Sequence, residues 1–212
     1  MRWHSLAALA LGAGLAFAGP KSASADIISY TLTTANDTSA VGSGPYATVQ
    51  VNLTSGTTAT ITFTASSDYS LVDSNIADVN VNAASWTIGT FSSTPSTTIS
   101  DTGSGNVSTF GVFNQTTKEQ NASTLLSTVS FVLTDTGGTW ANAASVLTAN
   151  ANGFIAAAHV ASAAQCILTP TACTGFVSVP GPLAGTGLPG LIVACGALIA
   201  LARRRRDGLT HA

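Results

Sequence analysis

The chain has 212 residues, a length that indicates one domain with appended segments. Only 8% of the residues are charged, and the basic ones gather near the two ends. Residues 26–182 contain eight acids and a single base, Lys118, for a net charge of −7. An acidic region of this kind lacks the basic patch that nucleic acids require, which excludes nucleic-acid binding.

The amino-terminal segment has the pattern of a secretory signal peptide. Arg2 and His4 precede an uncharged apolar stretch at residues 6–18, which is too short to span a bilayer comfortably. The small residues Ala23 and Ala25 then stand just before Asp26. This order predicts a signal peptide at residues 1–25, removed by signal peptidase between Ala25 and Asp26. The run Ala16-Phe17-Ala18 is a second candidate cleavage site.

The region that follows has the composition of a β-structure. About a third of residues 26–178 are Ser or Thr, and residues that favour helices are scarce. Alternate positions are apolar in residues 46–54 and again in residues 58–66, with a glycine-containing turn between them. We predict a hairpin that buries one face: Ala47, Val49, Val51 and Leu53 against Ala59, Ile61, Phe63 and Ala65.

Other short segments carry similar signals and are separated by polar turn clusters at residues 92–106 and 134–138. We expect strands at residues 27–33, 77–82, 85–91, 107–113, 127–134 and 174–179. This pattern predicts an all-β fold, an antiparallel β-sandwich of residues 26–178 with a jelly-roll-like variant as an alternative. One short helix is expected at residues 140–147, and the alanine-rich stretch after it fits either helix or strand.

Two of the three cysteines, Cys166 and Cys173, close a short loop. In an exported protein such a pair favours a disulfide over free thiols or a metal site.

The carboxy-terminal segment predicts a membrane helix. Residues 183–202 would extend about 30 Å as a helix, which matches a bilayer core. The following Arg203, Arg204, Arg205 and Arg206 would remain on the cytoplasmic side. Pro189 and several glycines make this span marginal, which favours a temporary anchor in the inner membrane.

Residues 179–212 resemble the PEP-CTERM sorting signal of Gram-negative bacteria that produce exopolysaccharide. The resemblance consists of the motif Val179-Pro180-Gly181-Pro182, the apolar helix at residues 183–202 and the basic tail at residues 203–212. The segments "VNVNAASWTIGTF" and "GTWANAASVLTANANGFIAAAH" also resemble a body found with such tails. The family's usual acidic residue between the prolines is replaced by Gly181.

This resemblance implies a partner and a destination. The partner is an exosortase-like membrane protease that reads the proline-containing motif, and the destination is the cell surface or the medium. Independently of the family, two prolines forbid a helix across residues 179–182, which predicts an extended segment accessible to a protease.

Catalysis has one candidate base, His159, and no recognisable motif around it. Serines and acids are so abundant that a Ser-His-Asp set can be assembled on paper in many ways, and "GxSxG", "HExxH" and phosphate-loop spacings do not occur. We therefore expect a protein that is not an enzyme.

Two binding sites remain as alternatives. Asp68, Asp73 and Asp78 recur at five-residue spacing and are weak candidates for a calcium site, although three loop acids are commonly just solvated. Thr58, Thr60, Thr62 and Thr64 would form a row of hydroxyls suited to sugar or ice, although a single strand is a small platform. We expect no obligatory cofactor or metal.

Together these observations predict an exported surface or matrix protein, sorted through the inner membrane and associated with exopolysaccharide or other surface proteins. A carbohydrate-, calcium- or ice-binding module is the alternative.

Overall fold

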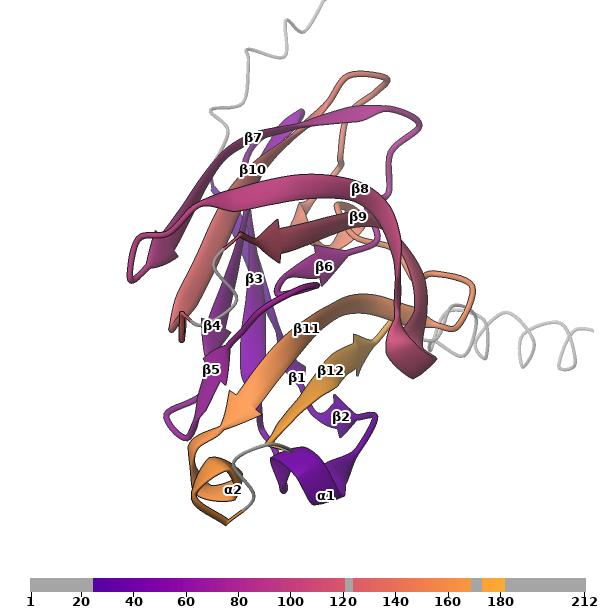
Figure 1. The fold of residues 1–212 in the computed structure, drawn as a ribbon. Coiled ribbons are helices and arrows are strands. Elements are labelled where there is room, and N and C mark those ends of the chain that lie inside the picture. Colours follow the sequence, from indigo (N-terminus) through magenta and orange to yellow (C-terminus); the bar gives the residue numbers. More distant parts are fainter. Residues whose placement is uncertain (1–24, 121–123, 169–172, 182–212) are drawn as a thin grey trace, which may run out of the picture.

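The structure, a computed structural model, describes residues 25–120, 124–168 and 173–181 (Figure 1). Two antiparallel sheets make up most of it. Sheet 1 has the order β1 (Asp26–Leu32), β3 (Ala47–Ser55), β4 (Thr58–Ala65), β10 (Thr128–Asp135) and β7 (Trp86–Thr94). Sheet 2 has the order β2 (Thr34–Ala35), β12 (Thr174–Pro180), β11 (Phe154–Ser162), β6 (Asp78–Val79), β9 (Gly111–Glu119) and β8 (Ile99–Val107), and β5 (Tyr69–Leu71) also pairs with β11.

The helices are short and lie outside the sheets. They are α1 (Thr38–Val41), α2 (Ala163–Leu168) and the 3-10 turns η1 (Ser108–Phe110) and η2 (Ala143–Ser145). The all-β prediction is confirmed at this level: two mostly antiparallel sheets with few helices. Among the described residues, no helix has the length and apolar character needed to cross a bilayer. The expected membrane helix at residues 183–202 lies outside the described ranges.

The predicted hairpin is confirmed as β3 and β4, with Val49 opposite Phe63 and Val51 opposite Ile61. Its apolar face is buried, and it contributes to one core shared by the two sheets. Ile61 and Phe131 enter this core from sheet 1, and Val160 and Val177 enter it from sheet 2. The alternation of apolar and polar residues therefore has its usual cause, a sheet with one buried face.

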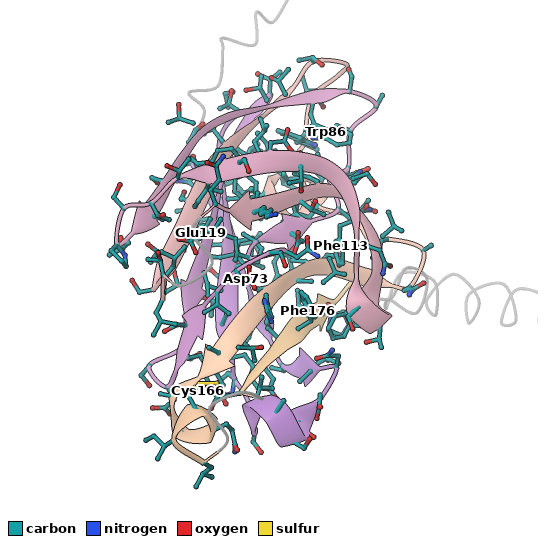
Figure 2. All side chains as sticks on the ribbon, in the orientation of Figure 1. Asp73, Trp86, Phe113, Glu119, Cys166 and Phe176 are labelled. Atoms are coloured by element: carbon teal, nitrogen blue, oxygen red, sulfur yellow. A yellow bond between two sulfur atoms is a disulfide. The ribbon has the colours of Figure 1, made fainter. Side chains whose placement is uncertain are left out.

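A second, smaller cluster lies between sheet 2 and the end of the β8–β9 hairpin, which arches across β6 and β11 in Figure 1. Val107, Phe110 and Phe113 pack on Ala157, with Phe176 against them (Figure 2). Sheet 2 is thus covered on both faces near β11, which explains why Phe154–Ser162 shows no alternation. Such a run does not distinguish helix from strand by its period.

Three sequence expectations were wrong. Residues 107–113 are not one strand, because positive φ angles at Ser108 (42°) and Gly111 (89°) reverse the chain between β8 and β9. The polar cluster at residues 92–106 contains most of β8, an edge strand whose residues between the buried Ile99 and Val107 are exposed or half-buried. Residues 140–147 hold only η2, where Asn142 caps a single turn through the Ser145 N–H (3.0 Å).

Candidate functional site

The outer face of sheet 1 carries hydroxyl and amide side chains in rows that cross the strands. Residues directly opposite in antiparallel strands project to the same face. Because Val49, Ile61 and Phe131 face the core, their neighbours along each strand face outward. One row consists of five threonines, one from each strand: Thr31, Thr48, Thr64, Thr128 and Thr94.

Further rows run parallel to this one. The second row contains Ser29, Gln50, Thr62, Ser130 and Ser92. The third row contains Ile27, Asn52, Thr60 and Val132, and the fourth contains Thr58, Thr134 and Thr87. We call these four rows the hydroxyl face.

The hydroxyl face is regular and partly preorganised. Neighbouring strands lie about 4.8 Å apart, and successive rows lie about 6.8 Å apart along a strand. Thr62 and Ser130 share a hydrogen bond between their hydroxyls (3.0 Å), and the Gln50 amide donates to the Ser29 hydroxyl (3.4 Å). Threonine has few accessible χ1 rotamers, so ordering these side chains against a ligand costs little entropy.

The hydroxyl face is also free of charge, although the domain is acidic. The two acids within the strands of sheet 1, Asp26 and Asp135, occupy inward positions at strand ends. Asp26 stands opposite Leu53 and accepts a hydrogen bond from the Ala143 N–H (2.6 Å), and Asp135 is buried. Apart from the apolar Ile27 and Val132, the face therefore offers only neutral donors and acceptors, each hydroxyl able to donate one hydrogen bond and accept two.

His159 lies on the other sheet, on the side of β11 that the β8–β9 hairpin covers. Its ring stacks on Phe176 with the centroids 4.4 Å apart. Burial lowers the pKa of His159, and the Asp73 carboxylate acts in the opposite direction. The buried Nδ1 has no hydrogen-bond partner among the described residues, and backbone groups of Val72 and Ser74 interact with the ring and also raise the pKa of His159.

Around His159 the backbone is strained. The three non-glycine residues with positive φ in the described ranges are Asp73 (57°), Asn75 (56°) and Ser108 (42°). The His159 N–H donates to the Asn75 carbonyl (3.0 Å), and the Asn75 amide donates to the Asn106 carbonyl (3.4 Å). Strained residues persist where surrounding contacts hold them, and these contacts fasten the tip of the β8–β9 hairpin to sheet 2.

Asn36, which lies on the other edge of β12, also connects the β8–β9 hairpin to sheet 2. Its amide nitrogen donates to the Ser108 hydroxyl (3.0 Å), and its amide oxygen accepts from the Phe176 N–H (2.9 Å). These contacts give the residues around His159 a structural role, which is to hold the β8–β9 hairpin on sheet 2.

The three aspartates considered for calcium do not form one site. Asp68 is exposed before β5, Asp73 is half-buried beyond β5, and Asp78 is fully buried in β6. Burial raises the pKa of Asp78 well above its ordinary value, so its carboxyl resists ionisation. Within the described ranges no group of three or more His, Cys, Asp or Glu side chains is placed to hold a metal ion.

The structure joins Cys166 to Cys173 in a disulfide at the end of α2 (Figure 2). Of the signal-cleavage residues, Ala25 is exposed and Asp26 begins β1, whereas Ala23 lies outside the described residues. Pro182 and Arg203–Arg206 lie outside them too.

The first residues of the sorting motif lie at the end of the folded domain. Val179 and Pro180 form the end of β12, and Val179 is 8% exposed in the main core. The Gly181 N–H donates to the Gly153 carbonyl (2.7 Å). Val179 and Pro180 are extended as the last two residues of β12, with Val179 buried and Pro180 exposed, and Gly181 follows the strand.

No family model matches the chain, and neither the curated proteins nor the solved structures contain a match to it.

Proposed function

We propose that this is an exported, non-enzymatic β-sandwich protein of the cell surface or extracellular matrix, and that its hydroxyl face contacts neutral exopolysaccharide. The observation that carries the proposal is the row of five threonines across sheet 1, with three further uncharged rows beside it. Sugar hydroxyls pair with Ser and Thr hydroxyls as both donors and acceptors.

The composition of the hydroxyl face favours a neutral, hydroxyl-rich ligand over other classes. An anionic polymer would require basic side chains, and none occupies an outward position in the four rows. A tightly bound protein would require aromatic, Met or Arg anchors, and the rows contain none of these either. Many weak, regularly spaced hydrogen bonds instead suit a long repeating chain, whose repeats bind with high effective concentration.

The proposed export route takes its support from the sequence. In this proposal signal peptidase removes residues 1–25, and residues 183–202 hold the precursor in the inner membrane, with Arg203–Arg206 on the cytoplasmic side. An exosortase-like protease then reads Val179–Pro182, and the mature protein reaches the cell surface. The Cys166–Cys173 disulfide is consistent with an oxidising compartment.

Affinity electrophoresis tests the binding proposal. The full chain, purified in mild detergent, is run through native gels that contain dextran, a neutral glucan, or alginate, an anionic polymer. We expect retardation by dextran alone, weakened about tenfold in the Thr48→Val, Thr64→Val double variant, which loses about 1.4 kcal/mol of hydrogen bonding. The matched control is Thr148→Val with Thr174→Val, two exposed threonines away from the hydroxyl face. Equal mobility with and without dextran would overturn the proposal.

A further inference from the structure

The chain leaves the domain through β12, which is paired on both edges at residues 177–178 and on one edge at residues 179–180, where Pro180 is exposed. In β12, Val177 and Ser178 pair with β2 on one edge, and Val179 and Pro180 stand opposite Ala156 and Phe154 of β11 on the other. The Gly181 N–H continues this pattern to the Gly153 carbonyl at 2.7 Å. The backbone is therefore engaged up to Gly181, three residues into the motif Val179–Pro182.

Gly181 is required at this point by space and not by backbone conformation. A Cβ atom here would lie 2.9 Å from the Ala149 Cβ, 3.0 Å from the Ile155 Cγ2 and 3.4 Å from the Gly153 carbonyl oxygen. Real Cβ atoms essentially never come within 3.0 Å of another heavy atom, so any side chain would push the segment away from residues 149–155. An acidic side chain would in addition bring a charge against Ile155, which is buried.

From these contacts we propose that the folded domain itself limits where the carboxy-terminal segment is cut: the bonds up to Pro180–Gly181 are protected, and the cut falls beyond Gly181. A protease binds its substrate as an extended strand through main-chain hydrogen bonds. The main chain of residues 177–181 is already paired along one edge with β11 and Gly153, and residues 177–178 are also paired with β2 on the other edge. Because it has no side chain, Gly181 allows the chain at the end of β12 to pack closely against residues 149–155.

The step itself is hydrolysis of one peptide bond. The hydroxyl of water stays on the new carboxylate of the domain, and its proton goes to the new amine of the released segment. The inference rests on the proposed function in one respect, the existence of a processing protease. The protection of residues 179–181 is a property of the fold alone.

Limited proteolysis tests the protection of residues 179–181 separately from the existence of a processing protease. The full chain in mild detergent is digested with proteinase K, a broad-specificity protease, and the resistant fragment is measured by intact mass. We expect its carboxy terminus at or beyond Gly181. A resistant fragment that ends before Val179 while the domain remains folded would overturn the inference.

Gly181→Glu restores the acid that the resemblance leads one to expect, and it should release the end of β12. We expect trimming between residues 177 and 181 to become about tenfold faster, because protease attack follows the population of the locally opened state. Gly56→Glu is the matched control, since a Cβ at Gly56 meets only Thr139 at an ordinary 3.7 Å. Trimming of Gly181→Glu at the wild-type rate would contradict the role of Gly181.

Gly181→Ala guards against a variant that fails to fold. A single methyl group should give the same change to a smaller degree, while thermal unfolding shows that the core persists. In cells, a product that retains Arg203–Arg206 would count against processing and leave the proteolysis result untouched. A product cut before Val179 would count against the protection inferred here.

Discussion

Asp78 lies directly opposite Ala157 in the antiparallel pair of β6 and β11, and its carboxyl group is fully buried. Ala157 belongs to the second hydrophobic cluster, so Asp78 projects to the same covered side of sheet 2. The Thr117 N–H lies close enough to favour the carboxylate slightly, but neither carboxyl oxygen has a hydrogen bond of good geometry. Desolvation dominates and raises the pKa of Asp78.

This burial predicts a stability that falls as the pH rises. The folded state holds the proton of Asp78 more tightly than the unfolded state, whose ordinary pKa is about 3.9. The free energy of unfolding should therefore decrease from about pH 4 up to the raised pKa, by at most about 1.4 kcal/mol per pH unit. Asp78→Asn should remove this slope and be the more stable protein at pH 7.

Urea unfolding at pH 4, 5, 6 and 7 measures the effect, with exposed Asp68→Asn as the control. An identical slope in wild type and Asp78→Asn would show that the carboxyl is solvated.

His159 predicts a slope of opposite sign. Burial lowers the pKa of His159 in the folded state, so the unfolded state binds the proton more tightly. Stability should fall as the pH drops from about 6.5 toward the lowered pKa of His159. His159→Phe, which keeps a ring against Phe176, should abolish this loss.

Asp73→Asn removes the carboxylate that counteracts the burial of His159, and it should lower the pKa of His159 further. An NMR titration of the ring protons follows this directly. An upward shift in Asp73→Asn would contradict the assigned cause.

The disulfide predicts a local effect. Cys166 and Cys173 are seven residues apart, and the loop-entropy relation gives about 2.5 kcal/mol for a ring of this size. Since α2 has no buried residue, we expect the Cys166→Ser, Cys173→Ser variant to lose no more than this, with faster amide exchange in α2. Slower folding of the whole domain, or a loss well above this value, would show that the bond supports the main core.

The sequence predicted those parts of the fold that depend on the alternation of apolar and polar residues within one hairpin. Val49 and Phe63 alternate with polar neighbours because their sheet has one buried face, and the turn between their strands contains Gly56. The prediction failed where the burial of a strand depends on contacts with distant parts of the chain. β11 is buried on both faces, so its sequence is apolar without alternation. β8 is an edge strand whose polar sequence is typical of a loop.

The candidate site could also be predicted only in part. Thr58–Thr64 could be identified as a hydroxyl row on one strand, but the row through Thr31, Thr64 and Thr94 depends on the pairing of five strands. Two of its four pairs, Thr64 with Thr128 and Thr128 with Thr94, join residues more than thirty positions apart, and no local periodicity encodes them. Gly181 was similarly hidden, because its requirement for space comes from Ala149 and Ile155.

The central claim is that the hydroxyl face binds neutral polysaccharide, and the most direct measurement is a titration of threonine methyl groups by NMR. The full chain, labelled at threonine methyls, is titrated with a soluble neutral glucan. We predict shifts that saturate at Thr48, Thr62, Thr64 and Thr128, with none at Thr109, Thr148 or Thr174. Shifts confined to the last three threonines, or no shifts at any glucan concentration, would contradict the account.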